Sequence, residues 1–142
     1  MFVRRVLVLA VSAVLAGACS PAASKNVSGT VEEWKITISP ATALAGEVTF
    51  TIKNNGEKEH EFVVRKTALA ADKLNLGADG EVIEDDPSLE EIGELAEIKP
   101  GTTGNTVTLT LTPGHYVIFC NLHVGELLHY QKGMHADLTV NG

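Results

Sequence analysis

The C-terminal part of the chain brings a thiol, two imidazoles and a thioether close together in sequence. These groups belong to Cys120, His123, His129 and Met134, and a further histidine, His60, lies far upstream in the segment NNGEKEHEFVV. Thiolates, imidazoles and thioethers are the soft and borderline ligands that suit copper. One thiolate, two imidazoles and a weak axial thioether form the ligand set of a blue-copper electron-transfer site. The residue types therefore predict a site for one mononuclear copper ion.

Each of these residues also has an ordinary explanation when it is taken alone. His60 precedes an apolar run and fits the end of a strand, whereas Cys120 and Met134 fit a hydrophobic core. Taken together, the residue types, their order and the His129-x4-Met134 spacing favour a metal site.

Alternation of hydrophobic and polar residues dominates the chain between its two ends. Residues 34–38, 48–52, 107–111 and 136–140 alternate in this way, and turn residues bound each run. A period of two is typical of half-buried strands joined by turns. The predicted fold is therefore all-β, a Greek-key antiparallel β-sandwich or barrel of about seven to eight strands.

Residues 66–99 break this rhythm and carry ten acidic side chains. Ser88, with Glu91 three residues later, matches the start of a helix. Three apolar residues would share one face of that helix: Leu89, Ile92 and Leu95. We therefore predict a long acidic insertion between core strands, carrying a short helix.

Residues 1–18 have the organisation of a secretory signal peptide. Arg4 and Arg5 precede an apolar stretch, which is followed by small residues. The stretch is short for a membrane span, so cleavage is favoured over a retained transmembrane helix. This predicts an exported protein, either anchored to the outer face of a bacterial cytoplasmic membrane or free in the periplasm.

The residues before Cys19 are similar to the lipobox of bacterial lipoproteins, in which the cysteine becomes the lipidated first residue. Ala16 departs from that pattern, because leucine is usual there. The sequence Ala-x-Ala also fits ordinary signal-peptide cleavage, so a soluble exported form is the alternative. We favour lipidation of Cys19, with residues 19–28 as the anchor and a flexible tether and residues 29–142 as the copper domain.

The net charge and the cysteine content further limit the possible functions. Loss of residues 1–18 removes two arginines and no acids, so the formal charge falls from −7 to −9. This net negative charge argues against nucleic-acid binding, which needs a basic surface, and it suits a basic redox partner. If Cys19 carries lipid, Cys120 has no disulfide partner in the chain. Such a thiol is either buried and inert or held by a metal.

Three segments resemble the cupredoxins, the plastocyanin and azurin family. NNGEKEHEFVV is similar to the segment around the first histidine of that family, PGHYVIFCNL to the strand that delivers the cysteine, and HYQKGMHADLTV to the stretch from the second histidine to the last strand. The resemblance spans roughly residues 30–141. It implies a copper site formed by His60, Cys120, His129 and Met134.

The chain departs from this family in the loop between the cysteine and the second histidine. Eight residues, Asn121 to Leu128, separate Cys120 from His129, where the family usually has only a few. His123 gives the tighter Cys-x2-His spacing and is the alternative ligand, but Met134 would then lie eleven residues beyond it. We therefore favour His129 and interpret the extra residues as an insertion.

The resemblance implies a one-electron carrier rather than an enzyme, in which copper cycles between two oxidation states. It further implies an apolar docking patch in which His129 reaches the surface beside Leu127, Leu128 and Val124. Expected partners are redox proteins, including a membrane oxidase or reductase, and the membrane itself through the lipid; we expect a monomer. Copper storage or delivery is the alternative function, followed by a metal-free binding module.

Four further residues have expected places around this site. Glu61 is expected to tie the two ligand loops together, and the backbone amide of Asn121 to orient the thiolate region. His115 and His135 are expected at the surface.

Overall fold

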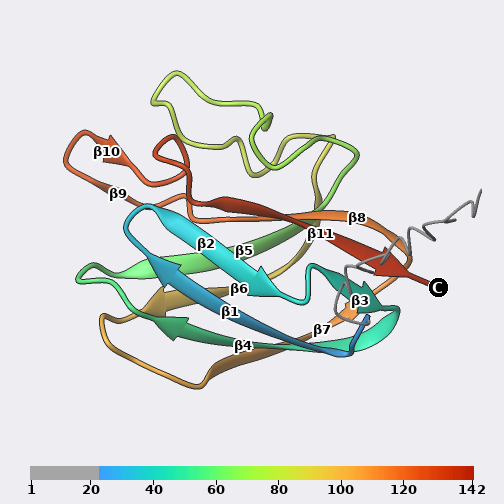
Figure 1. Ribbon diagram of the computed structural model, residues 1–142. Coiled ribbons are helices and arrows are strands. Elements are labelled where there is room, and N and C mark those ends of the chain that lie inside the picture. Colours follow the sequence, from blue (N-terminus) through green and yellow to red (C-terminus); the bar gives the residue numbers. More distant parts are fainter. Residues whose placement is uncertain (1–22) are drawn as a thin grey trace, which may run out of the picture.

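The computed structural model describes residues 23–142, which form eleven strands and no helix (Figure 1). The all-β prediction is confirmed. The strands are β1 (Asn26–Glu32), β2 (Lys35–Ser39), β3 (Thr42–Leu44), β4 (Gly46–Asn54), β5 (His60–Lys66), β6 (Glu90–Ile98), β7 (Asn105–Leu111), β8 (Gly114–Phe119), β9 (His123–Val124), β10 (Leu127–Leu128) and β11 (His135–Asn141).

Two sheets pack face to face as a sandwich (Figure 1). One sheet has the strand order β2-β1-β4-β7, the other β3-β11-β8-β5-β6, and β9 and β10 form a separate hairpin. Both sheets are mixed rather than purely antiparallel as predicted, because β1 pairs with β4 and β11 pairs with β3 in parallel. The chain crosses to the second sheet at β3 and returns in β4, which therefore runs in the same direction as β1.

The alternation in the sequence places one face of each strand in the core. Val48, Phe50 and Ile52 on β4 are fully buried, and the rings of Phe50 and Phe62 lie 5.5 Å apart across the two sheets. β5 and β8 are buried on both faces, as their continuous apolar runs indicate. Their outer faces are covered by residues 67–89, which contribute Ala71, Leu74, Val82 and Leu89 to a second apolar cluster.

The predicted helix after Ser88 is wrong, because Glu90–Ile98 forms strand β6 against β5. The pairing is interrupted by two register shifts, one between His60 and Phe62 and one between Val64 and Arg65. Each shift inserts an extra residue into β6, as a β-bulge does. Three apolar residues that face the core are therefore spaced by three instead of two: the partly buried Ile92 and Leu95, and the buried Ile98. The two bulges in β6 thus give the three-residue spacing of apolar side chains that is also typical of one face of a helix.

The sheet starts earlier than the predicted domain boundary. β1 begins at Asn26, and Ser24 already forms a bridge to Ala43, so part of the segment expected to be a tether belongs to the sandwich. Residues 1–18 and Cys19 lie outside the described residues. Within the described range, no helix has the length and apolarity to cross a bilayer.

Candidate metal centre

Three donor residues meet at one end of the sandwich. His60 is the first residue of β5, Cys120 directly follows β8, and His129 follows β10. Because β5 and β8 are antiparallel neighbours, with Val63 opposite Phe119, the start of β5 and the end of β8 lie at the same end of the sheet. The Nδ1 atom of His129 lies 3.3 Å from the Nδ1 atom of His60 and 3.3 Å from the Sγ atom of Cys120. All three donors lie within 4.8 Å of one another.

Met134 is fixed beside these donors by the backbone. The Cys120 N–H donates to the Met134 carbonyl at 3.1 Å, and the Met134 N–H donates to the His129 carbonyl at 3.2 Å. The side chain of Met134 is fully buried in the same core cluster as Cys120. Gly133 makes the turn before it, with φ at 114°, a conformation that favours glycine. The structure therefore brings all four predicted residues to one place.

The chemistry of the donors fits a soft metal ion. Burial lowers the pKa of His129 to about 4 and also lowers the pKa of His60, so both imidazoles are neutral and have a free lone pair near pH 7. Burial raises the pKa of the Cys120 thiol to about 12. Among the described residues, Cys120 is a free cysteine. A bound cation would offset the charge of a thiolate and lower the pKa of the thiol.

The alternative ligand, His123, lies outside this group. It is on the β9–β10 hairpin, where its side chain is 56% exposed and its Nδ1 atom lies 2.6 Å from Oε1 of Glu81. The extra residues of the ligand loop form this hairpin, and the His129 N–H donates to the Leu122 carbonyl at its base. This hydrogen bond brings His129 close to Cys120 despite the insertion. The geometry therefore favours His129 over His123 as the second histidine ligand.

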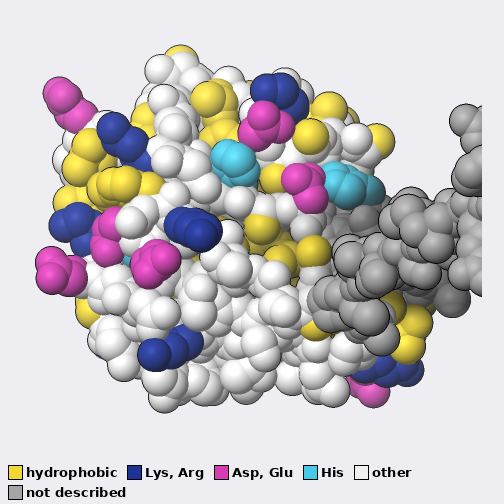
Figure 2. Space-filling model, in the orientation of Figure 1, with side chains coloured by type: hydrophobic (Ala, Val, Ile, Leu, Met, Phe, Trp, Pro, Cys, Tyr) yellow, Lys and Arg dark blue, Asp and Glu magenta, His cyan; other side chains and the backbone are white. Residues whose placement is uncertain are grey.

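The expectation that His129 reaches the surface is wrong, because its side chain is fully buried. The Trp34 indole packs against it in an edge-to-face arrangement, with ring centroids 5.0 Å apart. Of the other residues expected in the patch, Val124 and Leu127 are exposed on the hairpin and Leu128 is half-buried. Figure 2 shows hydrophobic side chains gathered over this hairpin, at the left of the view, with charged side chains around them.

Glu61 ties the two ligand loops together as expected. Its Oε1 accepts a hydrogen bond from the Asn121 N–H at 2.6 Å, and its own N–H donates to Cys120 Sγ at 3.4 Å. The Asn121 amide is thus engaged by Glu61 rather than by the thiol. Burial raises the pKa of Glu61 to about 7, against the hydrogen bond from Asn121 that lowers it.

The residues that follow two of the donors hold the acidic insertion in place. The side chain of Asn121 hydrogen-bonds both the N–H and the carbonyl of Val82. The Tyr130 hydroxyl accepts from the Leu74 N–H and donates to the Ala71 carbonyl. The loop 67–89 is therefore fastened to the ligand loops as well as to the sheet.

Sequence reasoning missed Glu33, which lies with Trp34 in the turn between β1 and β2. Its Oε1 is 3.3 Å from Nε2 of His60. Burial opposes ionisation of Glu33, but backbone N–H donors, including those of Glu57 and Lys58, outweigh it and hold its pKa below the usual range. No spacing pattern links this turn to His60, so the sequence carries no signal for the contact.

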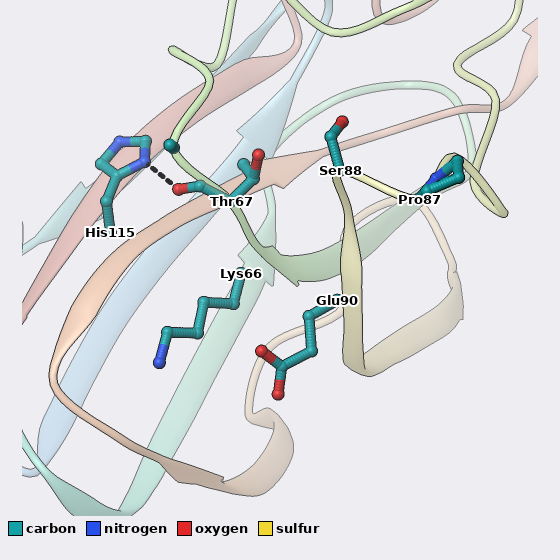
Figure 3. Close-up of a pocket in the computed structure, with 7 residues that line it drawn as sticks. Lys66, Thr67, Pro87, Ser88, Glu90 and His115 are labelled. Atoms are coloured by element: carbon teal, nitrogen blue, oxygen red, sulfur yellow. Dashed lines mark hydrogen bonds between the residues drawn. The ribbon is translucent and has the colours of Figure 1, made fainter.

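Figure 3 shows a broad surface pocket beside His115, at the opposite ends of β5 and β8 from the donors. His115 points to the Thr67 carbonyl, 2.8 Å from Nδ1, and its Nε2 atom pairs with Asp137. His135 lies against the ring of Tyr130. Both histidines are partly exposed, and neither belongs to the donor group that the described residues form.

A β-sandwich with a buried Cys–His–His group and an adjacent methionine at one end defines a cupredoxin, a class that binds one copper ion. A family comparison agrees and is more specific. Residues 6–142 match the sulfocyanin (SoxE) domain, and the chain belongs to that family. The resemblance to cupredoxins seen in the sequence is thus confirmed.

Solved structures support the same fold. A dithionite-reduced auracyanin from Roseiflexus castenholzii has a TM-score of 0.59 at 22% identity, over 85% of this chain and all of that one. Auracyanin B gives 0.52 at 20% identity, over 89% and 96% of the two chains. An azurin from Methylomonas sp. strain J gives 0.53 at 20% identity, over 84% and 100%. The comparison with curated protein sequences gives no match.

Proposed function

We propose that this chain is a one-electron carrier. His60, Cys120 and His129 would hold a single copper ion, with Met134 as a weaker fourth ligand. The observation that carries this proposal is the convergence of three buried soft donors within 4.8 Å in a member of a cupredoxin family. Bound copper supplies a Cu(I)/Cu(II) couple, and no substrate bond is made or broken.

The contribution of the protein is a site whose geometry is already set. Backbone hydrogen bonds fix the spacing of Cys120, His129 and Met134, and Glu61 bridges the loops that carry His60 and Cys120. All four side chains are fully buried, so water is kept away from the sulfur atoms. A rigid, dry site suits electron transfer because little has to move when the charge changes.

The cellular setting belongs to the same proposal. The N-terminal sequence supports export, with Cys19 lipidated and the domain held on the outer side of the cytoplasmic membrane. From there a monomeric carrier would meet redox proteins, including membrane oxidases or reductases. The exposed Val124 and Leu127 on the hairpin supply an apolar contact surface suited to brief encounters.

The direct test is to add Cu(II) to the purified domain and record its visible spectrum. We expect an intense thiolate-to-copper charge-transfer band that Cys120→Ser abolishes. His129→Ala should also abolish it, whereas the matched His123→Ala should leave it in place. Loss of the band in His123→Ala with retention in His129→Ala would overturn the ligand assignment.

Copper delivery is the second candidate function. It is favoured by the exposed His123–Glu81 pair on the hairpin of the ligand loop, which lies outside the buried donor group. Delivery predicts fast Cu(I) transfer to an acceptor chelator and slow electron self-exchange. An electron carrier shows the reverse, so measurement of both rates separates the two functions.

A further inference from the structure

The two ring nitrogens of His60 face different surroundings. Nδ1 points into the donor group, 3.3 Å from Nδ1 of His129. Nε2 is on the outer side, where Oε1 of Glu33 lies 3.3 Å away. This Nε2 atom is fully buried and makes no hydrogen bond of good geometry within the described residues. The Glu33 carboxylate is therefore a nearby acceptor for a proton on Nε2.

Hydrogen bonds hold the Glu33 carboxylate in place beside His60. Its Oε1 also accepts the Lys58 N–H at 2.7 Å, and its Oε2 accepts the Glu57 N–H at 3.2 Å. The carboxylate therefore joins the β1–β2 turn to the turn that leads into β5. Gly56 passes so close that a Cβ atom there would lie 2.6 Å from Oε2 of Glu33.

The turn that receives Glu33 is itself fixed from the core side. The Asn54 side chain is fully buried and donates to the carbonyls of Lys58 and Ile98, both at 2.8 Å, while its Oδ1 accepts the Gly56 N–H. The position of the carboxylate against the imidazole is thus set by hydrogen bonds on both sides of the turn.

A histidine that binds a metal through Nδ1 carries its remaining proton on Nε2. In protein metal sites that N–H commonly donates to a carboxylate or a carbonyl, which fixes the tautomer and the ring orientation and makes the imidazole a stronger donor. A fixed negative charge behind the ring also favours the more positive oxidation state of the ion. Glu33 is placed to have both effects on His60.

We propose that Glu33 is a positioning residue of the copper site: its carboxylate accepts the Nε2 proton of His60, holds Nδ1 toward the ion and lowers the reduction potential. This inference rests on the proposed copper site and adds to it a residue that is distant in sequence from all four ligands. It predicts that part of the potential is set by the β1–β2 turn.

The test compares Glu33→Gln and Glu33→Ala with Glu59→Gln in copper-loaded protein. Glu59 is exposed and adjacent to His60, so its replacement removes the same charge without touching the ring. In spectroelectrochemical titrations, both Glu33 variants should shift the potential upward by clearly more than Glu59→Gln does. Glu33→Gln keeps the shape of the side chain and should retain the visible band, whereas Glu33→Ala should also alter it. Equal shifts in Glu33→Gln and Glu59→Gln would overturn the proposal.

A second measurement uses the metal-free protein and does not depend on copper uptake. Long-range nitrogen–proton NMR of the His60 imidazole should show the proton on Nε2 in the wild type and in Glu59→Gln. In Glu33→Ala this preference should be lost. An unchanged tautomer in Glu33→Ala would overturn the proposal even if the wild type forms no blue site, and failure of the copper site would be seen separately in the missing band.

Discussion

The Trp34 indole and the imidazole of His129 pack edge to face, with ring centroids 5.0 Å apart and planes inclined at 66°. Trp34 adjoins Glu33, which faces the other imidazole, so one turn between β1 and β2 supports both histidines of the site. That turn lies far from the ligand loops in sequence. The site is therefore closed by a segment that contributes no ligand of its own.

Replacement of Trp34 should loosen this closure. Trp34→Leu removes the edge-to-face contact, and such aromatic pairs contribute about 0.5–1.5 kcal/mol beyond the area they bury. We expect a lower free energy of unfolding for the metal-free protein and faster copper loss to a chelator. Urea titration and stopped-flow chelation measure the two effects. Trp34→Phe retains a ring and should lie nearer the wild type; equal behaviour of Leu and Phe would contradict a role for the contact.

Replacement of Met134 distinguishes between two roles of this side chain, a weak copper ligand and a residue that only fills the core. Met134→Leu conserves volume and should lower the free energy of unfolding by less than about 1.5 kcal/mol. If the thioether is an axial ligand, its loss should raise the reduction potential while the visible band survives. Cyclic voltammetry and urea unfolding together decide this. A potential equal to that of the wild type would show that Met134 only fills the core.

Copper binding should release about one proton from the protein between pH 7 and 9. The pKa of the Cys120 thiol is raised to about 12, so the thiol is protonated across this range, whereas that of His129 is lowered to about 4 and its imidazole is already neutral. Calorimetric titrations in buffers of different ionisation enthalpy measure the release. No release, or a release that rises steeply toward pH 7, would contradict a neutral thiol with two neutral imidazoles.

Glu61 should make the stability of the metal-free protein depend on pH. Its pKa is raised from 4.5 to about 7, so the folded state binds the proton more tightly than the unfolded state. Its unfavourable contribution is fully present above pH 7 and is relieved as pH falls toward 4.5; a shift of this size corresponds to at most about 3 kcal/mol.

The opposing effect of His129 has to be subtracted from this dependence. The pKa of His129 is lowered from 6.5 to about 4, so its contribution to stability is lost as pH falls through that interval. The difference between wild type and Glu61→Gln isolates Glu61, and it should shrink in size from pH 8 to pH 5. Urea unfolding at several pH values measures it, and a constant difference would contradict the raised pKa.

Much of the site could be predicted because the types of its residues already indicate copper ligands. Cys120, His60 and a histidine five residues before Met134 are unusual together, and the alternating strands identify the scaffold. The helix expected after Ser88 rested on Leu89, Ile92 and Leu95, but bulges in β6 produce the spacing of Ile92, Leu95 and Ile98, and Leu89 packs in the other apolar cluster. Local periodicity cannot separate a bulged strand from a short helix when both give that spacing.

The surroundings of the two imidazoles were not predictable in the same way. Glu33 and Trp34 reach the site only because the β1–β2 turn packs beside the ligand loops, and no sequence spacing encodes that approach. Burial of His129 was missed for the same reason, since it depends on Trp34.

The hydrogen bond from the His129 N–H to the Leu122 carbonyl closes the base of the β9–β10 hairpin and so places the exposed residues of the loop on one side and the buried imidazole on the other. If the hairpin makes the proposed partner contacts, a library built at positions 123–128 should change which proteins dock while the colour and potential of the centre stay constant. The hairpin is therefore the segment at which partner choice could be re-engineered separately from the copper site.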